Sequence, residues 1–422
     1  MLIEFSVSNF RSFKDKVTLS MVASAMTEHR ETHTQQLEGQ LPLLKAAVIY
    51  GPNASGKSNF IKAFGAMREI VIASSKSQRG EKIATSPYLF DKTTQESPSE
   101  FEVIFVKNGV RYQYGFTATT ERVHEEWLFA YPKGRAQRWF TRIYDLSSSK
   151  YTTSYSEKLV GPKQLWTEAT RDNSLFLSTA VQLNSSQLAP IYDWFDSGTR
   201  VVGVDVNFPQ FTASLCKGSG TKSAITRMLQ AADFDIQEIE VSETKFDHAM
   251  GKDLPEEVRK ELEGRTFYDV KTVHSVEGGT TVRLDIEEES DGTQKFFGLV
   301  GPWLDIMATG KVVFIDELHE KLHPQMVHLL VSLFNNQDTN PYGAQIIFST
   351  HDTTILDQKH LRRDQVWFVA KKSDKSSKLY PLTTFSPRKD HEDLAKNYLS
   401  GRYGALPYFK NVAEALGAGI GL

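Results

Sequence analysis

The sequence feature that most constrains the fold is the octapeptide GPNASGKS at residues 51–58, which fits the phosphate-loop pattern G-x-x-x-x-G-K-[ST]. Glycines at its fixed positions let backbone N–H groups close around an anion, the lysine reaches phosphate oxygens, and the hydroxyl holds Mg²⁺. Residues 43–50 form an apolar run typical of a buried strand. Apolar side chains then recur at helical spacing, at Phe60, Ile61, Phe64, Met67 and Val71.

Strand, glycine-rich loop and helix in this order direct a helix N-terminus at the phosphates. We therefore interpret the octapeptide as a nucleotide-phosphate site rather than a chance glycine loop. The predicted binding residues are Gly51, Asn53, Ala54, Ser55, Gly56, Lys57, Ser58 and Asn59.

Composition places the chain among globular proteins of the reducing cytoplasm. It has 422 residues, of which 40% are hydrophobic and 24% charged, and a net charge of −3 that gives no global basic field for nucleic acid. Cys216 is the one cysteine, so neither an intrachain disulfide nor a Cys-based zinc site can form. No run approaches the roughly 18 apolar residues of a membrane span, and we expect no membrane association.

Strand and helix patterns predict an α/β fold with four parts. Residues 1–150 are strand-rich, with hairpins expected at Asn108-Gly109 and Lys133-Gly134. We interpret residues 151–265 as a mainly helical insertion, with Trp166 and Trp194 packing its helices, and residues 266–385 as a second α/β lobe with a mainly parallel sheet. Residues 386–422 are assigned to a C-terminal tail.

Acidic and histidine residues follow two of the predicted buried strands. Asp316 and Glu317 come after the apolar run 312–315, and His351 comes after the run 345–350. Beside a phosphate loop, we expect Asp316 to hold Mg²⁺, Glu317 to orient and deprotonate water, and His351 to contact the γ-phosphate. The alternatives are a carboxylate pair that caps the next helix and a solvated histidine.

A weaker anion site is the stretch Ser290-Asp291-Gly292-Thr293, which opens an apolar-faced helix. A serine hydroxyl and a glycine at a helix N-terminus can cup an anion. The alternative is an ordinary N-cap followed by a turn glycine.

Taken in order, these motifs resemble those of the ABC/SMC-like, AAA-type P-loop ATPase heads. The phosphate loop is similar to the G-P-N-x-S-G-K-S-N form, with Ala54 where glycine is frequent, and residues 314–317 resemble a Walker B motif with its catalytic glutamate. His351 resembles the switch histidine, and residues 290–293 resemble the signature motif but depart from its L-S-G-G form. Gln78 and Gln113 are both in range for the Q-loop glutamine.

The resemblance to such heads implies a head-to-tail dimer with composite sites. Ser290, Gly292 and Thr293 of one copy would contact ATP held by Lys57 of another, with Mg²⁺ as cofactor.

A narrower resemblance, to the RloA-type abortive-infection ATPases of bacteria, runs nearly end to end. It is carried by Asn9-Phe10-Arg11-Ser12-Phe13, Leu322-His323-Pro324, residues 363–366 and residues 398–405. It implies an ATPase that regulates a nuclease-type effector during phage infection. The alternatives are an SMC-like DNA-repair ATPase and a scaffold that uses ATP structurally.

Two further features have competing interpretations. Residues 319–323 spell H-E-x-x-H, a zinc-protease string, but Pro324 favours a helix that starts there and not one that ends there. The cluster Arg362, Arg363, Lys371, Lys372, Lys375 and Lys378 could bind a nucleic-acid backbone, although a solvated surface is the simpler interpretation.

Overall fold

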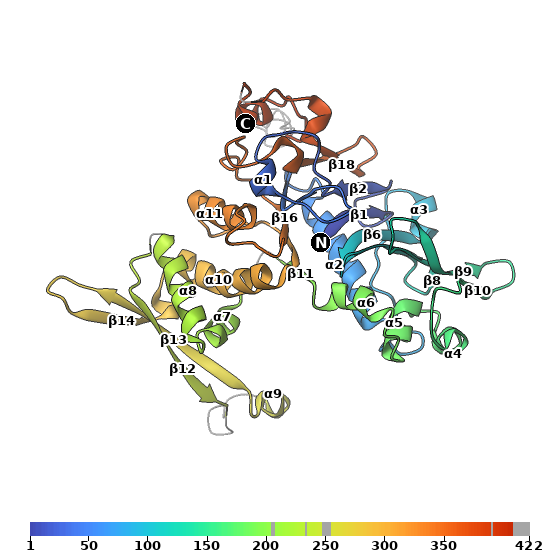
Figure 1. Cartoon of the computed structure of the whole chain (residues 1–422), viewed down its shortest axis with the longest axis horizontal. Coiled ribbons are helices and arrows are strands. Elements are labelled where there is room, and N and C mark those ends of the chain that lie inside the picture. The colour runs from blue at the N-terminus through green and yellow to red at the C-terminus, as the bar shows by residue number, and fades with distance from the viewer. Residues whose placement is uncertain (204–206, 233, 247–254, 390, 408–422) are drawn as a thin grey trace, which may run out of the picture. The chain divides into compact units, whose positions relative to one another are not determined.

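The computed structural model describes residues 1–203, 207–232, 234–246, 255–389 and 391–407 (Figure 1). Its contacts group them into two compact units. Unit 1 comprises residues 1–203, 310–318 and 331–422, and unit 2 comprises residues 204–309 and 319–330. The predicted boundaries at residues 150 and 265 differ from these, because residues 151–203 group with the N-terminal part of the chain.

Unit 1 contains an antiparallel sheet of seven strands in the order β10-β9-β8-β7-β6-β1-β2 over its described residues. Figure 1 shows β1, β2 and β6 side by side. Its hairpins turn at Asn108-Gly109 and near Gly134, as expected, and Asn108 and Gly109 both have positive φ. The strands are β1 (Leu2–Ser8), β2 (Val17–Ser20), β6 (Ser99–Lys107), β7 (Val110–Ala118), β8 (Val123–Tyr131), β9 (Gln137–Asp145) and β10 (Lys150–Tyr155).

The second sheet of unit 1 is mainly parallel, with strand order β11-β15-β16-β5-β17-β18. Among the described strands of this sheet, β18 alone pairs antiparallel, at the edge. Every residue of β5, β15 and β16 is buried, which suits strands covered on both faces. The strands are β5 (Ala46–Tyr50), β11 (Thr199–Val202), β15 (Val312–Ile315), β16 (Gln345–Ser349), β17 (Val366–Lys371) and β18 (Ser377–Pro381), and a small pair is formed by β3 (Thr34–Gln35) and β4 (Leu43–Leu44).

Helix α2 (Lys57–Ala73) joins the two sheets through aromatic packing. Phe64 stacks on Phe314 of β15 with ring centroids 3.9 Å apart, and Phe5 of β1 meets Phe60 and Phe64 edge-on at 5.3 Å each. These rings fix where the N-terminus of α2 lies against the carboxyl ends of β5 and β15. The expected α/β architecture, a β-rich lobe plus a mainly parallel sheet, is confirmed.

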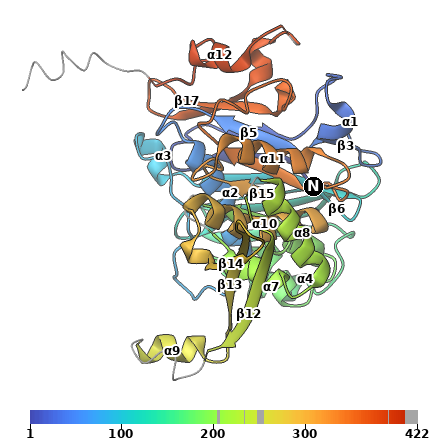
Figure 2. The same ribbon diagram turned by 90° about the vertical axis from the view of Figure 1, so that its left-hand side faces the viewer.

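The remaining helices of unit 1 are short. The segment 151–203 contributes three of them. Trp166 of α4 meets Phe176 of α5 edge-on at 6.2 Å, as predicted, whereas Trp194 stacks on Phe105 of β6 at 4.1 Å and so packs on the antiparallel sheet. The helices are α1 (Arg30–His33), α3 (Lys92–Glu96), α4 (Lys163–Ala169), α5 (Phe176–Gln182), α6 (Ala189–Asp196) and α12 (Leu394–Leu399). Figure 2 shows α12 together with β17.

Unit 2 combines helices with an antiparallel sheet in the order β12-β13-β14 over its described residues. Helix α10 packs mainly on α7 and α8. The elements are α7 (Pro209–Leu215), α8 (Ser219–Ala231), β12 (Glu238–Lys245), α9 (Glu256–Leu262), β13 (Thr266–Ser275), β14 (Thr281–Asp285) and α10 (Asp291–Thr309). Helix α11 (Pro324–Asn335) begins in unit 2 and ends in unit 1. No helix among the described residues is long and apolar enough to cross a membrane.

Candidate functional site

The phosphate loop follows β5 and ends where α2 begins, as the sequence predicts. Gly56 has φ +118°, and a Cβ there would lie 2.4 Å from Ser377 Oγ and 2.8 Å from Ser12 Oγ. Ala54 also has a positive φ, of 59°, which a residue with a Cβ adopts at a cost. Gly51 has φ +157°, and a Cβ there would lie 2.3 Å from Val369 O. The loop is therefore a tight turn in which both of these glycines are required by conformation and space.

Lys57 is the first residue of α2 and its side chain is only 4% exposed. Its ammonium donates to Gly51 O at 3.0 Å, lies 2.9 Å from His351 Nε2, and lies 3.8 Å from Glu317 Oε1. Burial lowers the Lys57 pKa, and the nearby carboxylates of Glu317 and Asp316 oppose that shift. The Lys57 ammonium thus lies beside Glu317 and His351, two side chains that the sequence predicts at the same site.

Asp316 joins the phosphate loop to the neighbouring strands. Its Oδ1 accepts from Ser58 Oγ at 3.1 Å and from Ser349 Oγ at 2.7 Å. Ser349 Oγ in turn accepts from the backbone N–H of Glu317 at 2.8 Å. β5, β15 and β16 are adjacent in the sheet, so strand order brings these side chains together.

Glu317 and His351 face each other beside the loop. Glu317 Oε1 lies 3.5 Å from His351 Nε2. Glu317 has φ 55°, a left-handed conformation that turns the chain just beyond β15. The arrangement puts a carboxylate, an imidazole and an ammonium within one site.

Two serines far apart in the chain support the loop and escaped the sequence analysis. Ser12 Oγ accepts from Asn59 Nδ2 at 2.9 Å, and Ser12 O accepts from the N–H of Ser377 at 2.7 Å. Ser377 Oγ donates to Ser55 O. The only sequence signal was that Ser12 belongs to the stretch 9–13 that carries the narrower resemblance.

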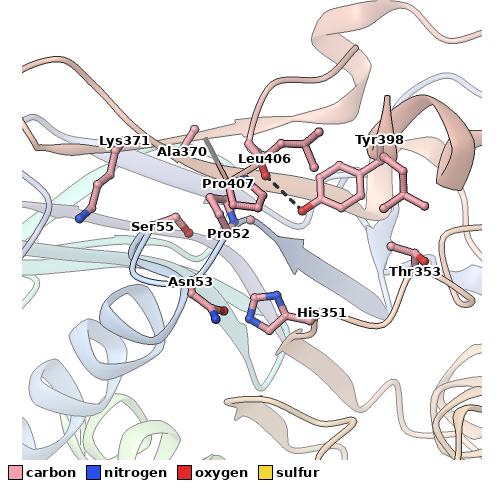
Figure 3. Close-up of a pocket in the computed structure, with 13 residues that line it drawn as sticks. Pro52, Asn53, Ser55, His351, Thr353, Ala370, Lys371, Tyr398, Leu406 and Pro407 are labelled. Atoms are coloured by element: carbon pink, nitrogen blue, oxygen red, sulfur yellow. Dashed lines mark hydrogen bonds between the residues drawn. The ribbon is translucent and has the colours of Figure 1, made fainter. Parts of the chain in front are cut away.

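Two cavities border the loop. The smaller, of about 380 Å³, is lined by loop residues and Glu317, His351, Ser12, Phe90, Lys371 and Lys375. The larger, of about 890 Å³, is lined by loop residues and His351, Thr353, Ala370, Lys371, Tyr398, Leu399 and residues 405–407 (Figure 3). In Figure 3 the Tyr398 hydroxyl points to the chain near Leu406, and it donates to Ala405 O at 3.2 Å.

The predicted signature stretch lies in unit 2. Ser290 is exposed, and its Oγ accepts from the N–H of Thr293 at 3.2 Å and lies 2.8 Å from Thr293 Oγ1. Thr293 is buried, and the Asp291 carboxylate lies 3.2 Å from Lys321 Nζ. Ser290 therefore caps α10 in its own unit, and a role for Ser290, Gly292 and Thr293 toward a second copy stays a prediction.

Three other sequence features find structural roles. Gln113 bonds Glu102 and Tyr131 within the antiparallel sheet, and neither it nor Gln78 lines the two cavities. His319 precedes α11, which begins at Pro324, so the H-E-x-x-H string does not lie on one helix. Arg362 is not part of a basic surface, because it is fully buried and pairs with Asp364 at 2.7 Å.

No curated protein matches the sequence. The SMC head domain from Thermotoga maritima aligns with a TM-score of 0.40 at 13% identity, covering 90% of this chain and 98% of that one. An SmcHead bound to the C-winged helix domain of ScpA aligns with a TM-score of 0.39 at 12% identity, covering 90% and 96%.

The sequence comparison with family models is decisive. Residues 46–357 match the family described as "AAA domain, putative AbiEii toxin, Type IV TA system", and this match spans more than half of the 422 residues. It runs from β5 through Asp316, Glu317 and His351. The chain therefore belongs to this AAA-domain family.

Proposed function

We propose that the protein is a Mg²⁺-dependent ATP-binding and ATP-hydrolysing switch. One observation supports this proposal above the others: Ser58, Asp316, Lys57, Glu317 and His351 meet beside a glycine-rich loop at the N-terminus of α2. Each has the chemistry that phosphoryl transfer requires, and membership of a P-loop AAA family supports nucleotide binding.

The residues fit a nucleotide and a hard divalent cation. Ser55 Oγ is buried and has no hydrogen-bond partner in the described part of the chain, so it is available to a phosphate oxygen. Ser58 and Asp316 offer oxygen atoms, which Mg²⁺ prefers.

Each side chain then has a defined role in hydrolysis. Bound Mg²⁺ would neutralise charge on the β- and γ-phosphates. Lys57 would exchange its contact with Gly51 O for phosphate oxygens, Glu317 would orient the attacking water and accept its proton, and His351 would donate to the γ-phosphate. The 3.5 Å between Glu317 Oε1 and His351 Nε2 lets one water molecule contact both groups.

Replacing Glu317 with glutamine tests the assignment. We expect Glu317→Gln to lower kcat for ATP hydrolysis by about 100-fold or more while ATP still binds, because the amide cannot accept the proton. Phosphate release and equilibrium ATP binding are the two measurements, each with Mg²⁺ and with EDTA.

Glu320→Gln is the matched control, since it makes the same change three residues away in the H-E-x-x-H string. If Glu317→Gln and Glu320→Gln lost the same fraction of turnover, the specific role of Glu317 would be contradicted. Unchanged hydrolysis in Glu317→Gln would exclude Glu317 as the residue that accepts the proton of the attacking water.

We further propose that two copies form composite sites, in which Ser290 and Gly292 of one copy contact ATP on Lys57 of the other. Ser290 is exposed at the start of a 19-residue helix, where backbone N–H groups favour an anion. The ion pair between Asp291 and Lys321 offsets a carboxylate that would otherwise repel phosphate.

The cellular role we propose is regulation of a nuclease-type effector in antiviral defence. It is supported by the words "putative AbiEii toxin" in the family description and by the RloA-type resemblance. Expression with its neighbouring genes should lower phage plaque counts, and Lys57→Ala should abolish that protection. Hydrolysis that DNA stimulates in the isolated protein would instead favour direct action on DNA.

A further inference from the structure

Phe90 is an aromatic side chain held open to solvent at the phosphate-loop cavity. The residue is 68% exposed, yet it lines the 380 Å³ cavity together with Lys57, Asn59 and Lys375. Lys375 Nζ lies over the Phe90 ring, 4.9 Å from its centroid. The lining of the cavity therefore includes an aromatic ring with an ammonium group beside it.

The turn that carries Phe90 is anchored on both sides. Tyr88 is buried, its N–H donates to Asn9 Oδ1 at 2.9 Å, and its hydroxyl donates to Asp374 O. Asp91 caps α3 by accepting from the N–H of Thr93 at 2.9 Å and pairs with Lys14 at 2.6 Å. The exposure of the ring thus comes from a fixed backbone and not from a loosely held loop.

The turn that carries Lys375 is fixed to the phosphate loop itself. Ser376 donates from its N–H and Oγ to Asp374 Oδ1, at 3.0 and 2.6 Å. Ser377 Oγ donates to Ser55 O inside the loop. Because Tyr88 bonds Asp374, the two turns and the loop form one connected frame around the cavity.

We propose that the Phe90 ring is the platform on which the base of the bound nucleoside triphosphate stacks. This rests on the proposed function, which supplies the triphosphate at Lys57 and Ser58. Ring-on-ring stacking is stronger than the contact of an exposed ammonium with a ring, so the base displaces Lys375 from Phe90. The displaced ammonium then pairs with phosphate oxygens, beside Lys371 and Lys57 of the same cavity.

Exposed phenylalanines are common on protein surfaces, so exposure alone does not identify a binding residue. What distinguishes Phe90 is its position in the lining of the cavity. Leu89 is the neighbouring side chain and is 65% exposed, but it does not line the cavity. Lys378 likewise lies over a ring, 4.9 Å from the centroid of Tyr380, and does not line the cavity. These two residues are matched controls for Phe90 and Lys375.

The test compares two probes in the full chain: ATP with Mg²⁺, and inorganic tripolyphosphate with Mg²⁺, which has the phosphates but no base. We expect Phe90→Ala to raise the Kd for ATP about 5- to 100-fold and to leave that for tripolyphosphate unchanged. Phe90→Tyr should bind ATP as the wild type does. Leu89→Ala should change neither Kd.

Lys375→Ala should weaken both probes, because its charge serves the phosphates, whereas Lys378→Ala should weaken neither. An unchanged ATP Kd in Phe90→Ala would overturn the proposal. Equal weakening of both probes in Phe90→Ala would also overturn it, since the ring would then only support the loop. The melting temperature of each variant verifies that it is folded.

If the proposed function is wrong, the two probes give a pattern of binding that differs from the one expected when only the base platform is wrong. Lys57→Ala should weaken both probes, and if wild-type protein binds neither of them, the phosphate site itself is wrong. If both probes bind through Lys57 and Phe90→Ala binds ATP normally, the phosphate site stands and only the base platform is rejected.

Discussion

At the scale of single residues, Lys57 is a buried cation in a site shaped for anions. Burial lowers its pKa, while Glu317 and Asp316 act in the opposite direction. A triphosphate brings more negative charge than either carboxylate and so favours the charged ammonium. Until a triphosphate binds, the contacts with Gly51 O and His351 hold the Lys57 ammonium in place.

The phosphate loop offers a matched pair of substitutions. Gly56→Ala should lower ATP affinity at least tenfold, because the new Cβ would meet Ser377 Oγ at 2.4 Å in a conformation with φ +118°. Ala54→Gly should leave ATP affinity unchanged or improve it, because Ala54 has φ 59°. Calorimetric ATP titration of both variants measures this, and tight binding by Gly56→Ala would contradict the loop geometry.

A second prediction at this scale concerns His33, which is buried between Thr32 Oγ1 at 2.8 Å and His360 O at 3.0 Å. Burial lowers its pKa from 6.5 to about 4, with smaller contributions from His29, Arg362 and Lys45. The unfolded chain therefore binds the proton more tightly. The stability from neutral His33 is complete above pH 6.5 and is lost as pH falls toward 4.

The loss amounts to at most about 3 kcal/mol. Melting temperatures between pH 7 and 4 should fall less steeply for His33→Gln than for the wild type. His391→Gln, at an exposed histidine, is the control and should keep the wild-type slope. Parallel slopes for all three proteins would contradict the prediction.

At the scale of elements, α12 and the segment that follows it form one wall of the larger cavity. Asp393 caps α12 by accepting from the N–H of Lys396 at 2.9 Å. Tyr398 stacks on Phe368 of β17 with centroids 5.5 Å apart, and Tyr403 stacks there at 5.4 Å. Tyr50, the residue before Gly51, meets Tyr398 at 5.5 Å, so the wall touches the start of the phosphate loop.

Truncating the Tyr398 side chain tests how much this wall contributes to the free energy of unfolding. Tyr398→Ala should lower the free energy of unfolding by about 3 kcal/mol, because it removes a buried ring. Tyr398→Phe should lose only about 1 kcal/mol, since it keeps the ring and removes the hydroxyl that bonds Ala405 O and the backbone of Gly51. Urea unfolding measures both, and equal losses would show that the hydrogen bond, and not the stacking, dominates.

Sequence reasoning succeeded where the signal is local. The run 312–315 predicted a buried strand, and the Asn108-Gly109 pair predicted a hairpin, because periodicity and turn chemistry act over a few residues. Phe90, Ser377 and Tyr398 carry no such local signal. Ser55 and Ser377 are 322 positions apart, and only the tertiary fold brings them together. Arg362 misled us because charge in a sequence does not reveal a buried partner such as Asp364.

At the scale of the whole molecule, the proposed composite site would take residues from unit 1 of one copy and from unit 2 of a second copy. Lys57 and Glu317 belong to unit 1, whereas Ser290 belongs to unit 2. A head-to-tail dimer with two composite sites predicts that two inactive variants can complement each other. In a mixed dimer, one site would carry both defects and the other would carry none.

Mixing Lys57→Ala with Ser290→Arg in equal amounts should therefore restore about a quarter of wild-type ATP hydrolysis. Each variant alone should be inactive, the first for lack of a phosphate ligand and the second because of a bulky side chain at the contact. A mixture of Lys57→Ala with Glu317→Gln is the control and should not recover, because both of these defects lie in unit 1. No recovery in the first mixture would exclude composite sites.

The chain passes between the two units four times, at residues 203/204, 309/310, 318/319 and 330/331. The short piece 310–318, which contains β15, Asp316 and Glu317, is thereby tethered to unit 2 at both ends. Unit 2 is consequently not a cassette that one pair of cuts can excise or transplant. An engineer who grafts it from a relative must splice at four junctions and keep the spacing across 310–318, because that piece carries Asp316 and Glu317.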